Sequence, residues 1–156
     1  MEKPMDMAGG LPRHAQRLLQ VGVLVFLFAL LVGLGVPRFA VPRLALSAHL
    51  LGIMQGTFLV AAGLLWPRLR LTRSQSGIGC GLAIYGCFAA WTANLCGAVW
   101  GAGSSMMPMA AAGARGSALQ EGVIRILLFT AALSLISMAI LILWGLRPSR
   151  AGGSGE

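Results

Sequence analysis

Four long apolar runs constrain the fold of this chain more than any other feature of its sequence. The runs cover residues 18–36, 44–66, 78–100 and 123–146. In a helix, the shortest of them rises about 28 Å, close to the thickness of the hydrocarbon core of a bilayer. Because lipid offers no partners for backbone N–H and C=O groups, such runs are expected to be α-helices. We therefore predict an all-α integral membrane protein: one domain, a four-transmembrane-helix bundle, with mobile tails at 1–12 and 148–156.

The composition agrees with a membrane protein and argues against nucleic acid as a partner. Charged residues make up 10% of the chain, against about 25% in soluble domains. The net charge of +8 comes almost entirely from arginine, and the arginines flank the apolar runs, as Arg68, Arg70 and Arg73 do. They are not interleaved with aromatic residues, as in a nucleic-acid-binding surface. The expected partner of these charges is the lipid bilayer, with its anionic headgroups.

The distribution of positive charge predicts the orientation. If four helices span, the two tails and the second loop share one side. That side carries eight Lys and Arg residues: Lys3, Arg13, Arg17, Arg68, Arg70, Arg73, Arg147 and Arg150. The other side carries four: Arg38, Arg43, Arg115 and Arg125. The positive-inside rule therefore predicts cytoplasmic termini, in the inner membrane of a bacterium. The first run exceeds the apolar stretch of about 7–15 residues in a signal peptide, so we expect a retained helix.

One histidine, His49, lies inside an apolar run. At 100° per residue it shares a helix stripe with Gly52, Gly56 and Gly63. Ionisable residues inside a membrane are usually functional. Glycines beside the imidazole would let a flat ligand approach, which predicts a cofactor or metal site at His49, Gly52 and Gly56. The alternative is a tight helix–helix contact, because Gly52-x-x-x-Gly56 is a typical packing motif.

Three further polar residues are candidates for contact with a substrate. The amides of Gln55 and Asn94 need hydrogen-bond partners that hydrocarbon does not offer. Tyr85 lies near the middle of the third run and can donate its hydroxyl to a substrate oxygen. For Asn94 the alternative is a hydrogen bond between helices. Since the second and third runs carry nearly all the polar groups, we expect one site between them, centred on His49.

The loop at 101–122 is the longest and holds few charges. It is either a lid over a membrane-buried site or a plain connector.

Several kinds of chemistry are excluded. No carboxylate lies within a run, since Glu121 only borders the fourth, so catalysis by paired carboxylates is not expected. A lone histidine does not make a protein-only zinc site, which needs three or four ligands. One axial histidine does suffice for a haem, because the porphyrin supplies the other four ligands.

Several segments resemble hydroxylaminobenzene mutases. The similarity covers 47–58 (SAHLLGIMQGTF), 62–67 (AGLLWP) and 100–108 (WGAGSSMMP). It also includes four single residues of the third run: Tyr85, Gly86, Trp91 and Asn94. These mutases convert an arylhydroxylamine to an ortho-aminophenol during nitroaromatic degradation. The same pattern is similar, more distantly, to styrene oxide isomerase.

The more distant resemblance implies a cofactor and an oligomer. Styrene oxide isomerases are four-helix membrane proteins that form trimers and hold haem b between neighbouring subunits. Their motif is Ala-His, followed six residues after the histidine by Asn-Gly. Here Ala48-His49 and Gln55-Gly56 match, with glutamine in place of asparagine. The resemblance thus implies that His49 is the haem ligand, that Gln55 lines the substrate side, and that the chain forms a homo-oligomer.

The hypothesis is a membrane mutase that moves a hydroxyl group within an arylhydroxylamine, without net redox change, with haem b as Lewis acid. Gln55, Tyr85 or Asn94 would hold the substrate. Three alternatives stay open: a haem-dependent epoxide isomerase, a haem or quinone electron-transfer subunit, and a small transporter or structural membrane protein without a cofactor.

Overall fold

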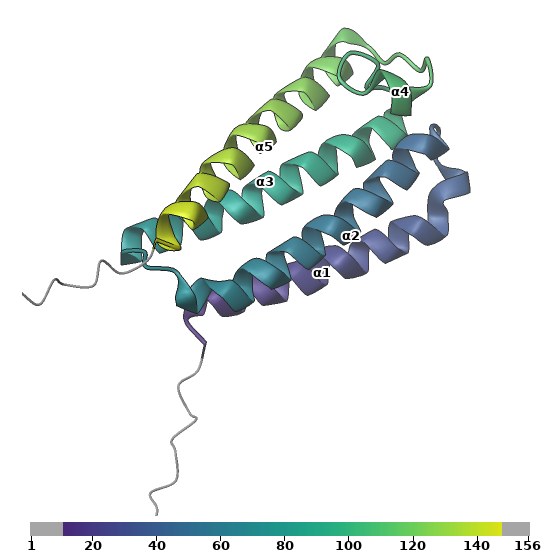
Figure 1. The fold of residues 1–156 in the computed structure, drawn as a ribbon. Helices are drawn as coiled ribbons and strands as arrows, with labels where there is room; N and C mark the ends of the chain where they lie inside the picture. The colour runs from purple at the N-terminus through teal and green to yellow at the C-terminus, as the bar shows by residue number, and fades with distance from the viewer. Residues whose placement is uncertain (1–10, 148–156) are drawn as a thin grey trace, which may run out of the picture.

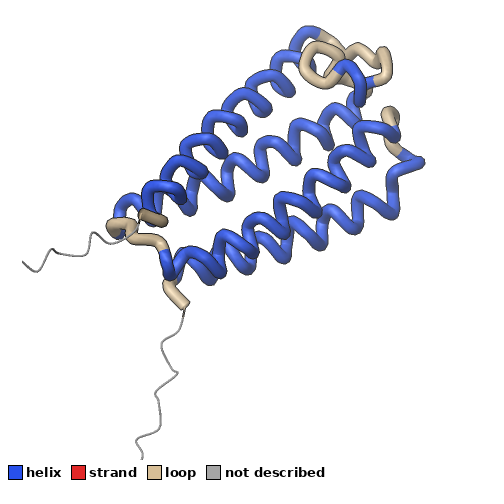
Figure 2. Tube along the Cα trace, viewed as in Figure 1, coloured by secondary structure: helices blue, strands red, loops and turns tan. Residues whose placement is uncertain are grey.

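A computed structural model describes residues 11–147, and these residues form helices joined by short loops (Figures 1 and 2). The four long helices are α1 (Arg13–Gly35), α2 (Pro42–Leu65), α3 (Arg73–Trp100) and α5 (Ala118–Gly145). Three short ones accompany them: η1 (Val36–Arg38), η2 (Trp66–Arg68) and α4 (Pro108–Ala111). All four long helices are long and apolar enough to cross a bilayer, so the prediction of an all-α protein with four such helices is confirmed. The tails expected to be mobile, 1–12 and 148–156, lie outside the described residues except for residues 11 and 12.

The long helices lie side by side as two pairs. Helix α1 packs mainly against α2, and α3 mainly against α5, while contacts between α2 and α3 join the two pairs. The start of α1 and the end of α5 lie at the same end of the bundle (Figure 1). We call this the terminal end, and the end with η1 and α4 the loop end.

Three helices begin a turn or more before the apolar runs do. Helix α1 begins at Arg13 rather than Leu18, α3 at Arg73 rather than Ile78, and α5 at Ala118 rather than Val123. In α3 and α5 a capping box fixes the start, formed by Thr72 with Gln75 and by Ser117 with Gln120. The caps satisfy backbone N–H groups of the first turn, so a polar turn can precede the apolar run.

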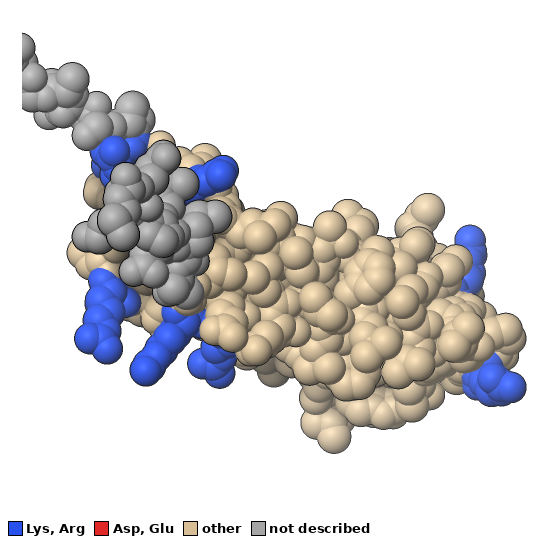
Figure 3. All heavy atoms as spheres, turned by 90° about the horizontal axis from the view of Figure 1, so that it is seen from below, with Lys and Arg blue, Asp and Glu red and all other residues tan. Residues whose placement is uncertain are grey.

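The helices differ in burial. Within their apolar windows, 17% of the residues of α1 and of α5 are buried, against 39% in α2 and 44% in α3. Helices α1 and α5 therefore present most of the lipid-facing surface. Figure 3 shows arginine side chains at the two ends of one face, and no charge on the surface between them. This uncharged band is what a hydrocarbon core requires.

Helices α1 and α2 touch through their backbones. A β-carbon at Gly56 would lie 2.8 Å from the carbonyl oxygen of Gly22, and one at Gly63 would lie 3.0 Å from that of Ala15. A larger side chain at either glycine would push the helices apart. The pair is therefore a small-residue contact of the kind typical between membrane helices.

One carboxylate anchors the loop at the loop end. Glu121 accepts hydrogen bonds from the backbone N–H groups of Gly103, Ser104, Ser105 and Gly116, at 2.8–3.2 Å. It also accepts one from the Ser105 hydroxyl, at 2.8 Å. Gly103 has a φ of +119°, a conformation that favours glycine. The loop is thus folded around the acidic residue at the start of α5.

Candidate functional site

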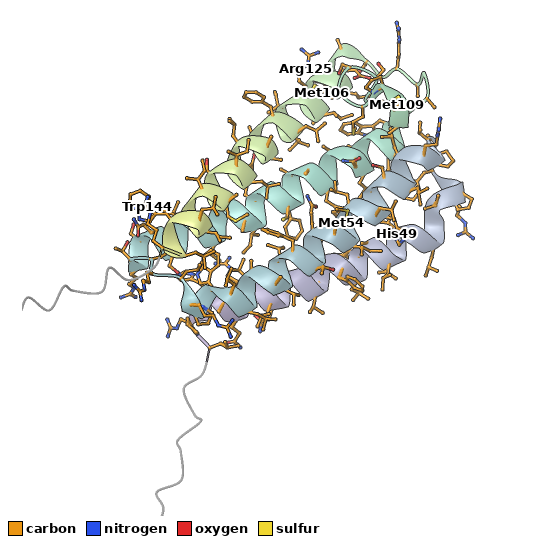
Figure 4. The ribbon with its side chains drawn as sticks, viewed as in Figure 1. His49, Met54, Met106, Met109, Arg125 and Trp144 are labelled. Atoms are coloured by element: carbon orange, nitrogen blue, oxygen red, sulfur yellow. The ribbon has the colours of Figure 1, made fainter. Side chains whose placement is uncertain are left out.

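His49 lies two turns into α2, in the half of the bundle nearer the loop end and away from Trp144 (Figure 4). Its Nδ1 lies 2.8 Å from the carbonyl oxygen of Ala29 on α1. A carbonyl can only accept, so Nδ1 carries the proton and donates it. Nε2 is then left with a free lone pair. Histidines that bind metals are typically oriented in this way, with one nitrogen donating to a carbonyl and the other facing the metal.

An apolar hollow of about 640 Å³ lies beside His49 on the outer side of the α1–α2 pair, toward the loop end. Its other lining residues are Leu30, Gly33, Leu34, Val36, Pro37 and Leu46. Gly33 lies directly against the imidazole, since a β-carbon there would be 2.5 Å from Nδ1. The histidine is therefore held by α1, and the expectation of a site between the second and third helices is wrong for this residue. Helical periodicity indicates which residues share one face of a helix, but not which neighbouring helix packs against that face.

Gly52 and Gly56 lie in the contact between helices. A β-carbon at Gly52 would be 2.6 Å from Cβ of Ala29 and 2.8 Å from Nε1 of Trp91, and neither glycine borders the hollow beside His49. Both glycines therefore lie where the alternative, a tight helix–helix contact, had placed them. Their role beside a cofactor stays a prediction.

Gln55 is one of two residues with a buried side-chain polar atom that lacks a hydrogen-bond partner among the described residues. Its side chain is 7% exposed, and its Oε1 is buried without a hydrogen-bond partner among the described residues. It borders a second hollow, of about 390 Å³, between α2, α3 and α5. The other lining residues are Leu51, Met54, Phe58, Cys87, Leu135, Met138 and Ala139. A buried acceptor without a donor costs roughly 1–3 kcal/mol, so this oxygen is suited to a ligand that donates.

Asn94 has its partners within the chain. Its Oδ1 accepts from the Ser47 hydroxyl on α2 at 3.0 Å, and its Nδ2 donates to the carbonyl of Ala90 at 3.0 Å. The alternative left open for this residue, a hydrogen bond between helices, is thus present. That bond joins α2 to α3 and links the two helix pairs.

Tyr85 lies away from Gln55. It is 49% exposed, and its hydroxyl donates to Oγ1 of Thr130 on α5 at 2.9 Å. It borders a third hollow, together with His14 and Arg17, toward the terminal end. The structure therefore brings together none of the four candidates His49, Gln55, Tyr85 and Asn94 in one hollow of the single chain.

Trp91 is a residue for which the sequence had predicted no role. Its Nε1 is buried without an acceptor among the described residues, and its ring stacks on Phe28 at a centroid distance of 6.4 Å. It was recognisable as the one tryptophan in the middle of an apolar run, whereas Trp66, Trp100 and Trp144 lie at run ends.

Comparison with known proteins identifies the family. The family model described as styrene oxide isomerase matches residues 14–147. The chain belongs to the styrene oxide isomerase family. It is 47% identical over 137 residues to hydroxylaminobenzene mutase HabB of Ectopseudomonas oleovorans, a match covering 88% of this chain and 84% of that protein. It is 38% identical over 125 residues to hydroxylaminobenzene mutase HabA of the same organism, covering 80% and 93%. No solved structure matches.

This family member is therefore an isomerase, an intramolecular transferase of the mutase kind, which confirms the enzymatic reading over the transporter and electron-transfer alternatives. Among the described residues no group of three or more His, Cys, Asp and Glu side chains lies close enough to hold a metal ion. The described residues thus offer an imidazole anchored on a carbonyl and a buried amide oxygen without a hydrogen-bond partner. His49 and Gln55 are six residues apart on α2, about 120° around its axis, so their hollows open on different faces.

Proposed function

We propose that this mutase converts hydroxylaminobenzene-type arylhydroxylamines to 2-aminophenols by intramolecular hydroxyl transfer. The N–O bond of the substrate breaks and a C–O bond forms at the ortho carbon. The proton released from that carbon ends on nitrogen. Substrate and product are isomers, so the reaction needs no oxidant or reductant. The names of the two similar mutases support this substrate class.

The observation that carries the proposal is Gln55, which borders an apolar hollow and whose buried Oε1 has no hydrogen-bond partner among the described residues. A hydroxylamine offers N–H and O–H donors beside a flat ring, which matches one acceptor and hydrocarbon walls. Gln55 would accept one of these hydrogen bonds and fix the orientation of the ring. The walls would keep bulk water from the reacting carbon, so that the hydroxyl group returns to the ring of the same molecule.

His49 and its hollow fit the predicted haem b. The free Nε2 of His49 would bind the iron, and the aliphatic walls of the hollow would accommodate the porphyrin. Haem b bound there would supply a Lewis-acid iron for the N-hydroxyl oxygen of the substrate. The residues of the chain would hold it: Ala29 orients the imidazole through Nδ1, and Gly33 leaves room for the ring.

We further propose that the protein is a homotrimer, as the resemblance implies. Because the His49 and Gln55 hollows open on different faces, a head-to-tail arrangement would place one beside the other across a subunit interface. Such an interface closes into a ring when the rotation between subunits allows it. The larger number of arginines at the terminal end supports cytoplasmic termini in a bacterial inner membrane.

Labelling tests the transfer step. The purified protein in detergent is given hydroxylaminobenzene in oxygen-18-labelled water, and the 2-aminophenol is analysed by mass spectrometry. We expect an unlabelled hydroxyl group. A product labelled mainly from water would contradict intramolecular transfer.

Substitution tests the role of Gln55. Gln55→Leu should lower kcat/KM at least about tenfold, because one hydrogen bond to the substrate is lost. Gln20→Leu is the matched control, since Gln20 is exposed on α1 and should leave the rate unchanged. Equal rates in the two variants would remove Gln55 from the site.

A spectrum tests the cofactor. The purified protein should show a haem Soret band, and His49→Ala should lose or shift it. A colourless wild-type protein, or an unchanged band in the variant, would contradict the assignment.

A second candidate function is epoxide isomerisation, which the matching family model favours. Hydroxylaminobenzene and styrene oxide assayed side by side distinguish the two by their kcat/KM values.

A further inference from the structure

The third hollow lies apart from the proposed chemistry, toward the terminal end. It has a volume of about 420 Å³ and lies between the start of α1 and the first half of α3. The start of α1 and the start of α3 share this end of the bundle (Figure 1). The residues that line it are His14, Arg17, Gly77, Cys80, Gly81, Ile84, Tyr85 and Phe88. The proposed reaction uses none of these residues and gives the hollow itself no role.

The hollow changes from polar to apolar along its length. His14 and Arg17 are one turn apart on α1 and lie at the end nearer the membrane surface. Ile84 and Phe88 continue the wall toward the middle of the bilayer. From Gly77 to Phe88 the helix rises about 16 Å, roughly half the thickness of the hydrocarbon core.

The floor of the hollow is open. A β-carbon at Gly81 would meet no atom within 4 Å, and one at Gly77 would approach only the His14 ring, at 3.8 Å. The hydroxyl of Tyr85 is already engaged, because it donates a hydrogen bond to Thr130 on α5. An elongated ligand can therefore lie along α3.

Within residues 11–147, the positive charge at this end has no acidic residue beside it. Among the described residues, the terminal end carries six arginines: Arg13, Arg17, Arg68, Arg70, Arg73 and Arg147. The acidic residue in the described range, Glu121, begins α5 at the loop end. Arg17 thus offers a guanidinium that makes no ion pair within residues 11–147, and this group matches phosphate geometry well.

We propose that this hollow binds one anionic phospholipid, with its phosphate on Arg17 and His14 and an acyl chain along Ile84 and Phe88. An amphipathic hollow with a cationic mouth matches the polarity of such a lipid from end to end. A neutral arylhydroxylamine would not need the positive charge of Arg17, and a free phosphate would not need the apolar wall of Ile84 and Phe88. Binding in this hollow would differ from the general attraction of surface arginines to anionic lipids, because the hollow has a defined shape and would hold one lipid.

Native mass spectrometry of the detergent-purified protein tests this, with titrations of dioleoylphosphatidylglycerol and dioleoylphosphatidylcholine. We expect one tightly bound phosphatidylglycerol per chain, and weaker binding of phosphatidylcholine. Arg17→Gln should weaken phosphatidylglycerol binding about fivefold, as loss of one arginine near a lipid surface does. Gly81→Leu should abolish the tight site by filling the floor.

Two controls match these variants. Arg73→Gln removes a charge at the same end but outside the hollow, and Gly122→Leu fills another helical glycine position with open space around it. Both should bind phosphatidylglycerol as the wild type does. Thermal unfolding establishes that each variant is folded, and His14→Gln replaces Arg17→Gln if the latter is not.

Three results would overturn the proposal. One is equal weakening by Arg17→Gln and Arg73→Gln, which would indicate non-specific attraction. Another is equally tight binding of the two lipids. The third is displacement of the lipid by millimolar glycerol 3-phosphate, which would indicate a site for the headgroup alone.

Discussion

Replacement of Gly33 by alanine should displace His49. The new β-carbon would lie 2.5 Å from Nδ1 of His49, whereas ordinary contacts begin at 3.4 Å. The imidazole, which is only partly buried and borders a hollow, would have to retreat by about 1 Å. A retreat of that size, directed away from α1, lengthens the 2.8 Å hydrogen bond to Ala29 beyond its useful range.

The magnitude follows from two contributions. The lost hydrogen bond is worth about 1 kcal/mol, and overpacking adds about 1–3 kcal/mol, so we expect destabilisation of about 2–4 kcal/mol. If His49 is the haem ligand, loss of the bond that orients it should also weaken haem binding about 10–100-fold.

Gly35→Ala is the matched control. Its β-carbon would approach the Phe39 ring at 3.5 Å, an ordinary contact, and it makes the same Gly-to-Ala change in the same helix. The assays are thermal unfolding of the detergent-purified variants and titration of haem followed by the Soret band. The unfolding measurement tests the geometry whether or not haem is the cofactor. If the two variants matched in both midpoint and haem affinity, the packing of His49 against Gly33 would be wrong.

Other substitutions test the loop and the contact between the helix pairs. Glu121→Gln should destabilise the protein by about 2 kcal/mol in chemical unfolding, because the amide NH₂ replaces an oxygen that accepts from the N–H and hydroxyl of Ser105. Retained stability would show that the loop does not depend on the carboxylate. Ser47→Ala should cost about 1 kcal/mol by removing the donor to Asn94, whereas Thr57→Ala, which loses only a bond within its own helix, should change stability less. Equal effects of the two would contradict a bond that links the pairs.

Hydropathy predicted the helices because length and apolarity alone decide whether a segment can span a bilayer. It placed the starts of α1, α3 and α5 late, because hydropathy does not register a polar first turn. The T-x-x-Q and S-x-x-Q caps at Thr72 and Ser117 were readable in the sequence and would have corrected the starts of α3 and α5.

The arrangement of the polar residues could not be read in the same way. Periodicity put His49 and two glycines on one stripe, but whether a ligand or another helix covers a stripe depends on how the helices pair. Gln55 and Asn94 are both buried amides in adjacent helices, and only the register of α2 against α3 decides that Asn94 meets Ser47 while the Gln55 oxygen meets no donor. That register depends on packing along the whole length of both helices.

The two helix pairs place the tight helix–helix contacts and the hollow beside Gln55 in different parts of the molecule. Gly22 and Gly56 bring the backbones of the first pair into contact, so changes within the pair are poorly tolerated. The hollow beside Gln55 instead lies along the seam where α2 meets α3 and α5. A residue there such as Met54, which is 69% exposed, can change size without separating either pair. If this hollow takes the substrate, as we propose, substitutions along the seam would change which substrates fit while both helix pairs keep their packing.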